Sequence, residues 1–511
     1  MQNNDKKVLL RISNLKQYFP LKGGRFVKAN DGITLDIYEG ETFGLVGESG
    51  CGKSTLGRTI LQLYHQTYGR TMYYGRSLDD LAPKYVIDTV KNLKARRTKL
   101  RELEQKRDKL EADYAKLSEK EQYAKHGELD TARKLAEDAL LDITKIVGGF
   151  LVVDDLDPVI AAYSKDYAIA RKLSGMEEKR QELQVDVDDA EYAKKTAEEA
   201  GKSGKDGQLQ KAQEKLKQCD DQIAALRAQL DAGRKEIEAL RAPYANDPEF
   251  QKYEAYRDDG IDLARLEYNE MRRLRRDMQL IFQDPYSSLN PRMSVGQIIS
   301  EGMQAHNMIK KKDARMQEMV LKIMDDCGLA PYFLHRFPHQ FSGGQRQRIG
   351  IARALATKPK FVVCDEAVSA LDVSIQAQII NLLLDLKEQQ NLTYMFITHD
   401  LSVVKYISDR VGVMYLGTMV ELAAADEIFH HPIHPYTEAL LNAIPTTDTV
   451  GAKELSILEG DIPSPVNPPK GCKFHTRCKY CTEICTQVVP EWEEVRPNHF
   501  VACHHKLEAK E

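Results

Sequence analysis

Residues 43–55 read Phe-Gly-Leu-Val-Gly-Glu-Ser-Gly-Cys-Gly-Lys-Ser-Thr, and this stretch decides the fold. Four residues that suit a buried strand run into the pattern G-x-x-x-x-G-K-S, and a helical pattern follows. Glycines let the backbone curl so that N–H groups converge on phosphate oxygens, while Lys53 neutralises the β/γ charge and Ser54 can bind Mg²⁺. The stretch therefore predicts a nucleotide-phosphate site, made by Gly47, Glu48, Ser49, Gly50, Cys51, Gly52, Lys53, Ser54 and Thr55.

The composition indicates several globular domains and a long polar segment. At 511 residues, with 42% hydrophobic and 29% charged residues, the chain is expected to form about two to four domains. The net charge is −4, from 73 basic and 77 acidic side chains, which gives no overall electrostatic case for a nucleic-acid partner. The N-terminus has no apolar leader and no run of about 18 apolar residues occurs, so we expect a cytosolic chain that does not itself span a membrane.

Short strands are expected on both sides of the phosphate stretch. The patterns predict them at residues 8–12, 27–29, 33–37, 42–46 and 69–75, with turns between them and a helix over 55–64. Aromatic residues lie upstream of the loop, where a ring could stack on an adenine; a plain core position is the equal alternative. These residues are Tyr18, Phe19 and Phe26, of which Tyr18 and Phe19 are the candidates for the adenine contact.

Between about residues 82 and 270 the composition turns to Lys, Glu, Gln, Ala and Leu. Gly148-Gly149, Asp157-Pro158, Ser174-Gly175 and residues 201–207 divide it into about four helices. A 3.5-residue repeat predicts left-handed coiled-coil packing. We expect an antiparallel helical hairpin that projects into solvent, and a docking arm for a partner is the alternative. The longer seam is Leu209, Ala212, Leu216, Cys219, Ile223, Leu226, Leu230, Gly233, Ile237 and Leu240; the shorter is Leu93, Leu100, Leu103, Leu110, Tyr114 and Leu117, with Arg96 and Arg107 as misfits.

Two later strands end in residues that suit hydrolysis of a phosphoanhydride. Residues 361–364 are apolar and lead to Asp365, which is suited to hold Mg²⁺, and to Glu366, which is suited to accept a proton from the attacking water. Residues 394–398 form another apolar run that delivers His399. A lone histidine is usually structural, but this strand-end position favours a catalytic role.

Two further polar sites lie between these stretches. A strand over 278–282 ends at Gln283, whose amide can reach the metal and the water at the γ-phosphate. Ser342, Gly343, Gly344 and Gln345 precede an Ala-rich helix, where backbone N–H groups attract phosphate. A single Ser-Gly-Gly is common in loops and indicates little alone. In this order after a phosphate loop, the block indicates a second anion site.

In this order the motifs resemble the ATP-binding cassette (ABC) family. The resemblance implies an α/β fold: a nucleotide-binding domain with a RecA-like core, an antiparallel β subdomain and a helical subdomain, carrying the coiled-coil insertion and a small Cys-rich extension. It divides the chain into 1–81 and 271–430 for the cassette, 82–270 for the insertion and 431–511 for the extension. The matching motifs are the Walker A loop Gly47–Ser54, the Q-loop Gln283, the signature Ser342–Gln345, the Walker B pair Asp365–Glu366, the D-loop Asp372 and the H-loop His399.

Further stretches look like the ATPase subunits of dipeptide and oligopeptide permeases, in particular the second, "F" subunit. They include Tyr38-Glu-Gly-Glu41, residues 281–293 and His434-Pro-Tyr-Thr-Glu-Ala-Leu-Leu441. This resemblance implies ATP and Mg²⁺ as cofactors, with Ser54, Gln283 and Asp365 at the metal and Glu366, His399 and Gln283 in catalysis. One departure is Ala367, where the family usually has proline.

The same resemblance implies partners and a location. Two cassettes would bind two ATP molecules, with Ser342 and Gly344 of one subunit capping the γ-phosphate held by the other. The implied partners are a second ABC ATPase subunit in a heterodimer, two transmembrane permease subunits and an extracellular substrate-binding protein, with no nucleic acid. The expected location is peripheral, on the cytoplasmic face of the cell membrane.

Five of the nine cysteines crowd the C-terminus, which in a reducing compartment favours a metal or cluster over disulfides. Matching the permease branch by position implies Cys472, Cys478, Cys485 and Cys503 as ligands of a [4Fe–4S] cluster. Four thiolates also suit Zn²⁺, and a tail without metal is the third alternative. Cys481 is an extra cysteine that could replace one ligand.

The main rival is an SMC-like DNA-associated ATPase, which also splits a cassette with a coiled coil. Three features oppose it: the insertion precedes Gln283, it is far shorter, and the permease-type tail is present. Binding to a phosphate backbone would also need a basic face, and only residues 272–276 qualify.

Overall fold

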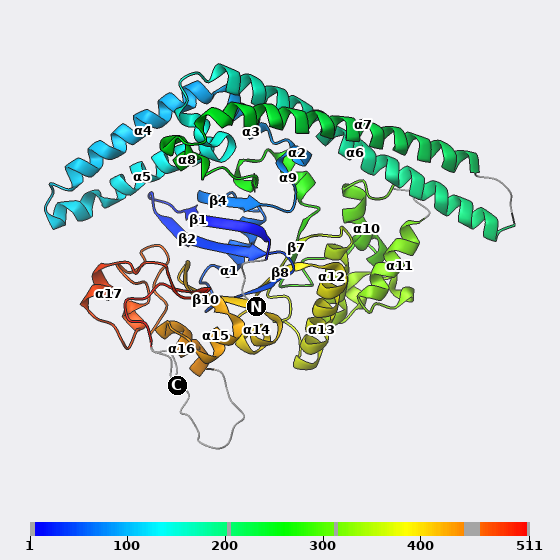
Figure 1. Cartoon of the computed structure of the whole chain (residues 1–511). Helices are drawn as coiled ribbons and strands as arrows, with labels where there is room; N and C mark the ends of the chain where they lie inside the picture. The colour runs from blue at the N-terminus through cyan, green and yellow to red at the C-terminus, as the bar shows by residue number, and fades with distance from the viewer. Residues whose placement is uncertain (1–5, 202–205, 311–314, 444–459, 508–511) are drawn as a thin grey trace. The chain divides into compact units, whose positions relative to one another are not determined.

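The computed structural model describes residues 6–201, 206–310, 315–443 and 460–507. The chain divides into two compact units (Figure 1). Unit 1 comprises Met1–Gly75 with Met271–Glu511, and unit 2 comprises Arg76–Glu270. In unit 1 the first β-sheet pairs β1 with β2 and β4, all antiparallel. Its strands are β1 (Val8–Pro20), β2 (Phe26–Tyr38) and β4 (Tyr68–Tyr73).

The short strands expected over residues 8–12, 27–29 and 33–37 are parts of two long ones, so the predicted turn at residues 30–32 is wrong. β2 continues through these residues because register shifts, as between Ile12 and Leu15 of β1, absorb the irregularity. Gly32 takes φ 85°, a left-handed conformation that glycine adopts without steric cost.

The second sheet of unit 1 has the order β11-β12-β10-β9-β3-β8-β7-β6 in the described residues. Strands β6, β7, β8, β3 and β9 run parallel, so their carboxyl ends meet at one edge. The bounds are β3 (Thr42–Val46), β6 (Met278–Ile281), β7 (Phe361–Asp365), β8 (Thr393–Ile397), β9 (Arg410–Tyr415), β10 (Thr418–Ala424), β11 (Glu493–Arg496) and β12 (His499–Val501).

Helices cover this sheet and complete two apolar cores. One core lies between β6–β8 and the helices α10–α13, and the other between β9–β10 and α14–α16 with Phe474 of the C-terminal tail. Between residues 295 and 326 the described part of the chain forms α10 and α11, and residues 311–314 between them lie outside that part. The bounds are α1 (Lys53–Ile60), α10 (Val295–Ala305), α11 (Met316–Asp326), α12 (Gly343–Leu355), α13 (Val373–Gln390), α14 (Leu401–Ile407), α15 (Ala425–His430), α16 (Pro435–Asn442) and α17 (Glu483–Gln487).

Unit 2 is almost entirely helical, and its long helices lie side by side in pairs (Figure 1). The α6–α7 pair is antiparallel, because its ion pairs advance along one helix as they retreat along the other: Lys165–Glu236, Glu177–Arg227 and Arg180–Asp220. The helices are α2 (Leu78–Leu81), α3 (Lys84–Lys91), α4 (Leu93–Tyr114), α5 (Glu119–Val147), α6 (Asp157–Glu199), α7 (Asp206–Arg241) and α8 (Pro248–Glu254); a short strand β5 (Ile261–Asp262) and α9 (Tyr268–Leu274), which crosses the unit boundary, follow.

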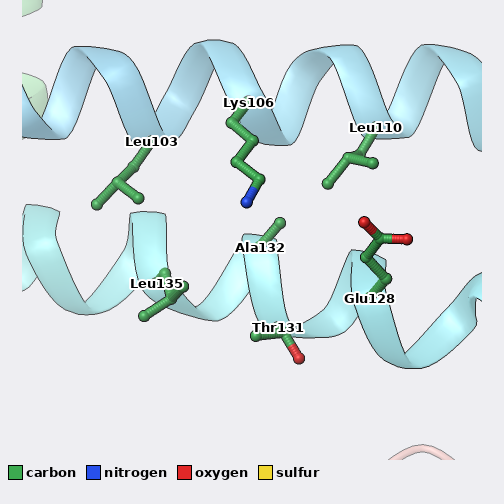
Figure 2. A pocket seen from close by; sticks show the side chains of 7 residues that line it. All are labelled: Leu103, Lys106, Leu110, Glu128, Thr131, Ala132 and Leu135. Carbon is green, nitrogen blue, oxygen red and sulfur yellow. The ribbon is translucent and has the colours of Figure 1, made fainter.

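The two expected seams differ in how they pack. On α7, Cys219, Ile223, Leu230 and Ile237 are buried. Between α4 and α5, in contrast, Figure 2 shows Leu103, Leu110 and other side chains around a cavity of about 180 Å³. Leu93 and Leu100 of the shorter seam are buried as well, so it is the later part of that seam, around Leu103 and Leu110, that leaves a cavity.

The break expected at Ser174-Gly175 is wrong, because both residues lie inside the continuous helix α6. Ser174 is 1% exposed and its hydroxyl donates to the Leu81 carbonyl at 3.3 Å, so packing within unit 2 overrides the weak local preference.

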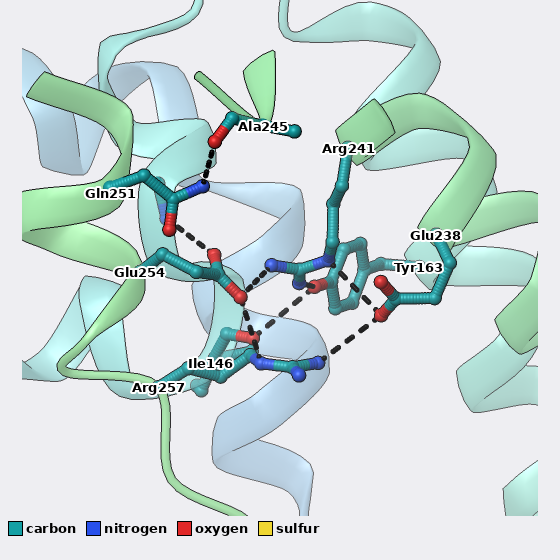
Figure 3. Close-up of polar contacts among 9 residues, drawn as sticks. Ile146, Tyr163, Glu238, Arg241, Ala245, Gln251, Glu254 and Arg257 are labelled. Atoms are coloured by element: carbon teal, nitrogen blue, oxygen red, sulfur yellow. Dashed lines mark hydrogen bonds and ion pairs between the residues drawn. The ribbon is translucent and has the colours of Figure 1, made fainter. Parts of the chain in front are cut away.

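Gly148-Gly149 begin a short 3₁₀ turn, where the Gly149 N–H donates to Glu254 Oε2 at 2.9 Å. Figure 3 shows Glu254 bound in turn by Arg241 and Arg257, and Arg241 also reaches the Tyr163 hydroxyl. This polar cluster, in which Arg241 is buried and Arg257 is exposed, joins the ends of α5, α6, α7 and α8.

Candidate functional site

The phosphate loop connects β3 to α1 in unit 1. Its three glycines with positive φ are Gly47, Gly50 and Gly52. A Cβ on Gly47 would lie 2.2 Å from the Met414 carbonyl oxygen, so a close approach of two backbones requires glycine there. Lys53 is 5% exposed and donates from Nζ to the carbonyl oxygens of Gly47 at 2.7 Å and Glu48 at 3.0 Å. The lysine ammonium therefore lies against the backbone carbonyls of the loop.

The first carboxylate after β7 lies against the start of α1. Ser54 Oγ donates to Asp365 Oδ1 at 2.5 Å, although 311 positions separate the two residues. Arg58, one turn further along α1, places a guanidinium nitrogen 3.2 Å from Asp365 Oδ2. Asp365 is 1% exposed, so these two contacts satisfy a buried charge. The hydroxyl and the carboxylate offer the oxygen ligands that Mg²⁺ prefers.

Glu366 lies between two other predicted residues. Gln283 Nε2 donates to its Oε2 at 2.5 Å, and His399 Nδ1 lies 3.4 Å from its Oε1. The Glu366 backbone has φ 47°, uncommon for a residue with a side chain, and its N–H donates to the Ile397 carbonyl at 2.9 Å. The strained backbone and the two polar neighbours hold this carboxylate where β6, β7 and β8 end.

Ala367, the one departure from the family pattern, is 2% exposed in the core beside the site. The Glu366 carboxylate therefore keeps both of its neighbours without a following proline.

The signature residues form the N-terminal cap of α12. Ser342 Oγ accepts from the Gln345 N–H at 3.3 Å, while Gln345 Oε1 accepts from the Ser342 N–H at 3.1 Å. Within the described residues, no hydrogen bond or ion pair joins these residues to the phosphate loop. Asp372 is the residue that precedes α13, and its carboxylate accepts from the Ser374 hydroxyl at 2.9 Å. The signature is therefore not part of the site that this chain assembles alone.

The aromatic pair before the loop is partly buried. The Tyr18 hydroxyl donates to Asp31 Oδ1 at 2.5 Å, and the Phe19 ring packs edge-on against Tyr64 at 5.3 Å between centroids. Burial, followed by the hydrogen bond to Asp31, raises the pKa of Tyr18 well above its usual range. Both side chains thus have partners within unit 1.

The C-terminal tail supplies contacts to the phosphate loop that the motifs did not predict. Arg477 donates from its two terminal nitrogens to Glu48 at 2.7 and 3.0 Å, and the Glu48 N–H donates to the Tyr436 hydroxyl at 2.9 Å. Tyr436 and Arg477 lie in stretches that match the permease branch, and this match is the sequence signal that could have pointed to them. Their partner, however, is 388 and 429 positions away.

The four predicted cysteine ligands lie near one another. Burial raises the pKa of Cys472 to about 11 and that of Cys503 to about 12, and the charge of neighbouring cysteines contributes to both. In the part of the chain that the structure describes, however, no three His, Cys, Asp or Glu side chains form a group that could hold a metal ion. The chemistry of four thiolates nevertheless suits a cluster or Zn²⁺.

A phosphate loop, a buried Ser–Asp pair and a carboxylate between glutamine and histidine define an ATP-hydrolysing cassette. The profile of the ABC transporter family matches residues 30–251 and 251–369, and the profile "Oligopeptide/dipeptide transporter, C-terminal region" matches residues 420–485. The chain belongs to the ABC transporter family and is an ATPase.

Relatives extend the match along the chain. It is 34% identical over 498 residues to the putative oligopeptide transport ATP-binding protein YkfD of Bacillus subtilis, covering 97% of this chain and 95% of that one. It is 52% identical over 250 residues to the oligopeptide transport ATP-binding protein AppF of B. subtilis, covering 48% and 75%. A putative peptide import ATP-binding protein of Brucella ovis is 54% identical over 245 residues, covering 48% and 77%. These relatives give no support to the DNA-associated alternative.

Proposed function

We propose that this protein is the energy-coupling ATPase subunit of an ABC importer for dipeptides, oligopeptides or related solutes. The observation that carries the ATPase part is Glu366, held between Gln283 and His399 beside the Ser54–Asp365 pair. The match of the C-terminal region and the names of the relatives support the peptide part.

We propose a role for each side chain of the site. The ammonium of Lys53 and the loop N–H groups bind the phosphates, and Ser54 and Asp365, with Gln283, would hold Mg²⁺. Bound Mg²⁺ neutralises the charge that develops on the β- and γ-oxygens. Glu366 accepts the proton of the attacking water, and His399 orients that water and the γ-phosphate.

A single chain leaves the signature residues unused, which supports a pair of cassettes. Ser342 and Gly344 at the start of α12 would direct N–H groups to the γ-phosphate bound by a second cassette. ATP would then close the pair and hydrolysis would release it, which drives attached subunits between two states. Tyr18 and Phe19 would contact the adenine, and Asp372 would lie at the shared face.

Cassettes of peptide importers act as dimers with permease subunits. For this chain we propose a second ATPase subunit in a heterodimer, two permease subunits, an extracellular binding protein and no nucleic acid. Among the described residues no helix combines the length and apolar character needed to cross a membrane. Attachment through permease subunits would place the protein at the cytoplasmic face of the cell membrane.

The helical unit and the cysteines complete the proposal. Residues 82–270 would form a coiled-coil arm, supported by the buried α7 seam and the antiparallel ion pairs with α6. Cys472, Cys478, Cys485 and Cys503 would hold a [4Fe–4S] cluster or Zn²⁺, supported by four thiols in one tail. Iron and zinc analysis of the purified protein tests this, and a metal-free preparation would overturn it.

The test of the function is Glu366→Gln in the complex purified from membranes. The amide keeps the size and the contacts of the carboxylate but cannot take a proton, so the ATPase rate should fall about 10²- to 10⁴-fold while ATP still binds. Glu388→Gln, on the exposed face of α13, is the matched control. Wild-type turnover in Glu366→Gln would refute the assignment of the base, and recovery of DNA-associated proteins without permease subunits would refute transport.

A further inference from the structure

Every polar group of Glu48 in the phosphate loop is engaged within the chain. Its carbonyl accepts from Lys53 Nζ at 3.0 Å and from the Cys51 N–H at 3.3 Å. Its N–H donates to the Tyr436 hydroxyl at 2.9 Å, and its carboxylate binds Arg477. Two of these four contacts are internal to the loop, and the other two come from the C-terminal extension. Glu48 is thus the point at which that extension holds the loop.

The contact with Arg477 has the geometry of a strong ion pair. Two nitrogens of one planar guanidinium meet two oxygens of one carboxylate, at 2.7 and 3.0 Å, an arrangement that sets direction as well as distance. The Arg477 side chain is 4% exposed and that of Glu48 is 22% exposed, so water screens the pair weakly. The guanidinium also lies 6.0 Å from the ring centre of Tyr415 at the end of β9, which limits its movement.

The second contact depends on the same segment of the tail. Tyr436 is fully buried, and its ring packs against Tyr415 at 4.7 Å and against Phe474 at 5.2 Å between centroids. Phe474 and Arg477 belong to one turn, which begins with Cys472 and ends with Cys478. That turn therefore reaches Glu48 twice, directly through Arg477 and indirectly through Tyr436.

We propose that Arg477 is a positioning residue for the phosphate loop: through Glu48 it holds the loop in the conformation that presents N–H groups to ATP. The Arg477 guanidinium touches neither the nucleotide nor the reacting atoms. Its effect is to lower the cost of ordering the loop when ATP binds. By the reciprocity of linked equilibria, ATP binding stabilises the turn 472–478 by the same factor.

The test compares ATP affinity and turnover in Arg477→Gln, Glu48→Gln, the double variant and Lys479→Gln. Lys479 is the matched control, because it lies in the same turn region and pairs with Glu438 at 2.9 Å, but it is 63% exposed and does not contact the loop. Loss of a charge-assisted bidentate pair should raise the KM and the Kd for ATP roughly tenfold, with kcat at saturating ATP changed by less than about twofold. Arg477→Lys should restore part of the affinity, and Lys479→Gln should change nothing.

The double variant separates positioning from simple anchoring of the tail. If the pair acts as a unit, the double variant has the same Kd as either single variant, whereas independent effects would multiply. Thiol labelling provides a second readout: ATP should protect the cysteines of the tail in wild type and protect them less in Arg477→Gln. Folded Arg477→Gln with wild-type Kd for ATP and wild-type protection would overturn the proposal. So would a Glu48→Gln variant with unchanged Kd, should Arg477→Gln not fold.

Discussion

His434 links the stability of the C-terminal extension to pH. The residue is 1% exposed, and as the N-cap of α16 its Nδ1 accepts from the Tyr436 N–H at 3.0 Å. Burial lowers the pKa of the imidazole to about 4, although the negative charge of Glu421 acts in the opposite direction. Nε2 has no hydrogen-bond partner in the described residues, so no acceptor there stabilises a proton on that nitrogen.

The sign and size of the effect follow from the two pKa values. An unfolded chain binds this proton near pH 6.5 and the folded chain only near pH 4, so the unfolded state carries more protons between these values. Stability is then fully present above about pH 6.5 and is lost as the pH falls toward 4. One pKa unit corresponds to about 1.4 kcal/mol, so His434 should remove about 2 kcal/mol at pH 5 and about 3 kcal/mol at pH 4.

The chain offers a local probe for this measurement. Trp492 is the single tryptophan, and its ring stacks on Phe500 of β12, a strand of the C-terminal segment that pairs with β10. Urea unfolding followed by tryptophan fluorescence at pH 8 and pH 5 should show the loss in wild type. His434→Asn keeps an N-cap acceptor without the titrating ring and should remove about 2 kcal/mol of the pH dependence.

The exposed His335→Asn is the control and should leave the pH dependence unchanged. The comparison uses the difference between the two pH values, because the smaller asparagine side chain also changes packing at every pH. If wild type and His434→Asn lose the same stability between pH 8 and pH 5, the buried neutral imidazole is not the cause.

Two further substitutions test the surroundings of the phosphate loop. Burial alone would raise the pKa of Asp31, but neighbouring charges, that of Lys473 first, outweigh burial and lower the pKa to about 2. The ion pair between Asp31 and Lys473 therefore stabilises the fold above about pH 4, and this stabilisation is lost as the pH falls toward 2. Lys473→Met should therefore reduce the loss of stability between pH 4 and pH 2 in acid unfolding. If the variant and the wild type lose the same stability over this range, the prediction is wrong. Gly52→Ala should abolish ATP binding measured by equilibrium titration, because φ is 102° and the new Cβ would lie 2.1 Å from the Ala29 carbonyl oxygen; wild-type affinity would refute it.

The nucleotide motifs could be located from sequence because each one is local. Gly47–Ser54 follows a strand and starts a helix, and Asp365–Glu366 and His399 end buried apolar strands. In a parallel sheet such ends meet at one edge, so the contacts Ser54–Asp365 and Glu366–His399 follow from strand order. The local pattern does not supply the left-handed backbone of Glu366, which depends on its N–H reaching the neighbouring strand.

The sequence signals for a helix break gave a wrong prediction where tertiary packing outweighed the local preference. Ser174-Gly175 has the composition of a helix break, yet a buried hydroxyl contact and the long partner α7 keep α6 continuous. Leu103 and Leu110 follow the heptad as well as the α7 residues do, yet they line a cavity. A heptad repeat specifies which face of a helix is apolar. The shape of the facing helix decides whether the two helices pack there without a cavity.

The contact between Arg477 and Glu48 could not be read from either motif alone. Glu48 lies in a glycine loop whose variable positions usually face solvent or ligand, and Arg477 lies in a cysteine-rich turn whose sequence draws attention to its thiols. The pair forms because the loop leaves β3 beside β9, whose end carries Tyr415, and the tail packs Phe474 onto that tyrosine. A segment that resembles a metal-binding appendage thus supplies the ion pair with Glu48 of the phosphate loop. A deletion of the tail that removes residues 472–478 is accordingly expected to weaken ATP binding, even when every Walker residue is intact.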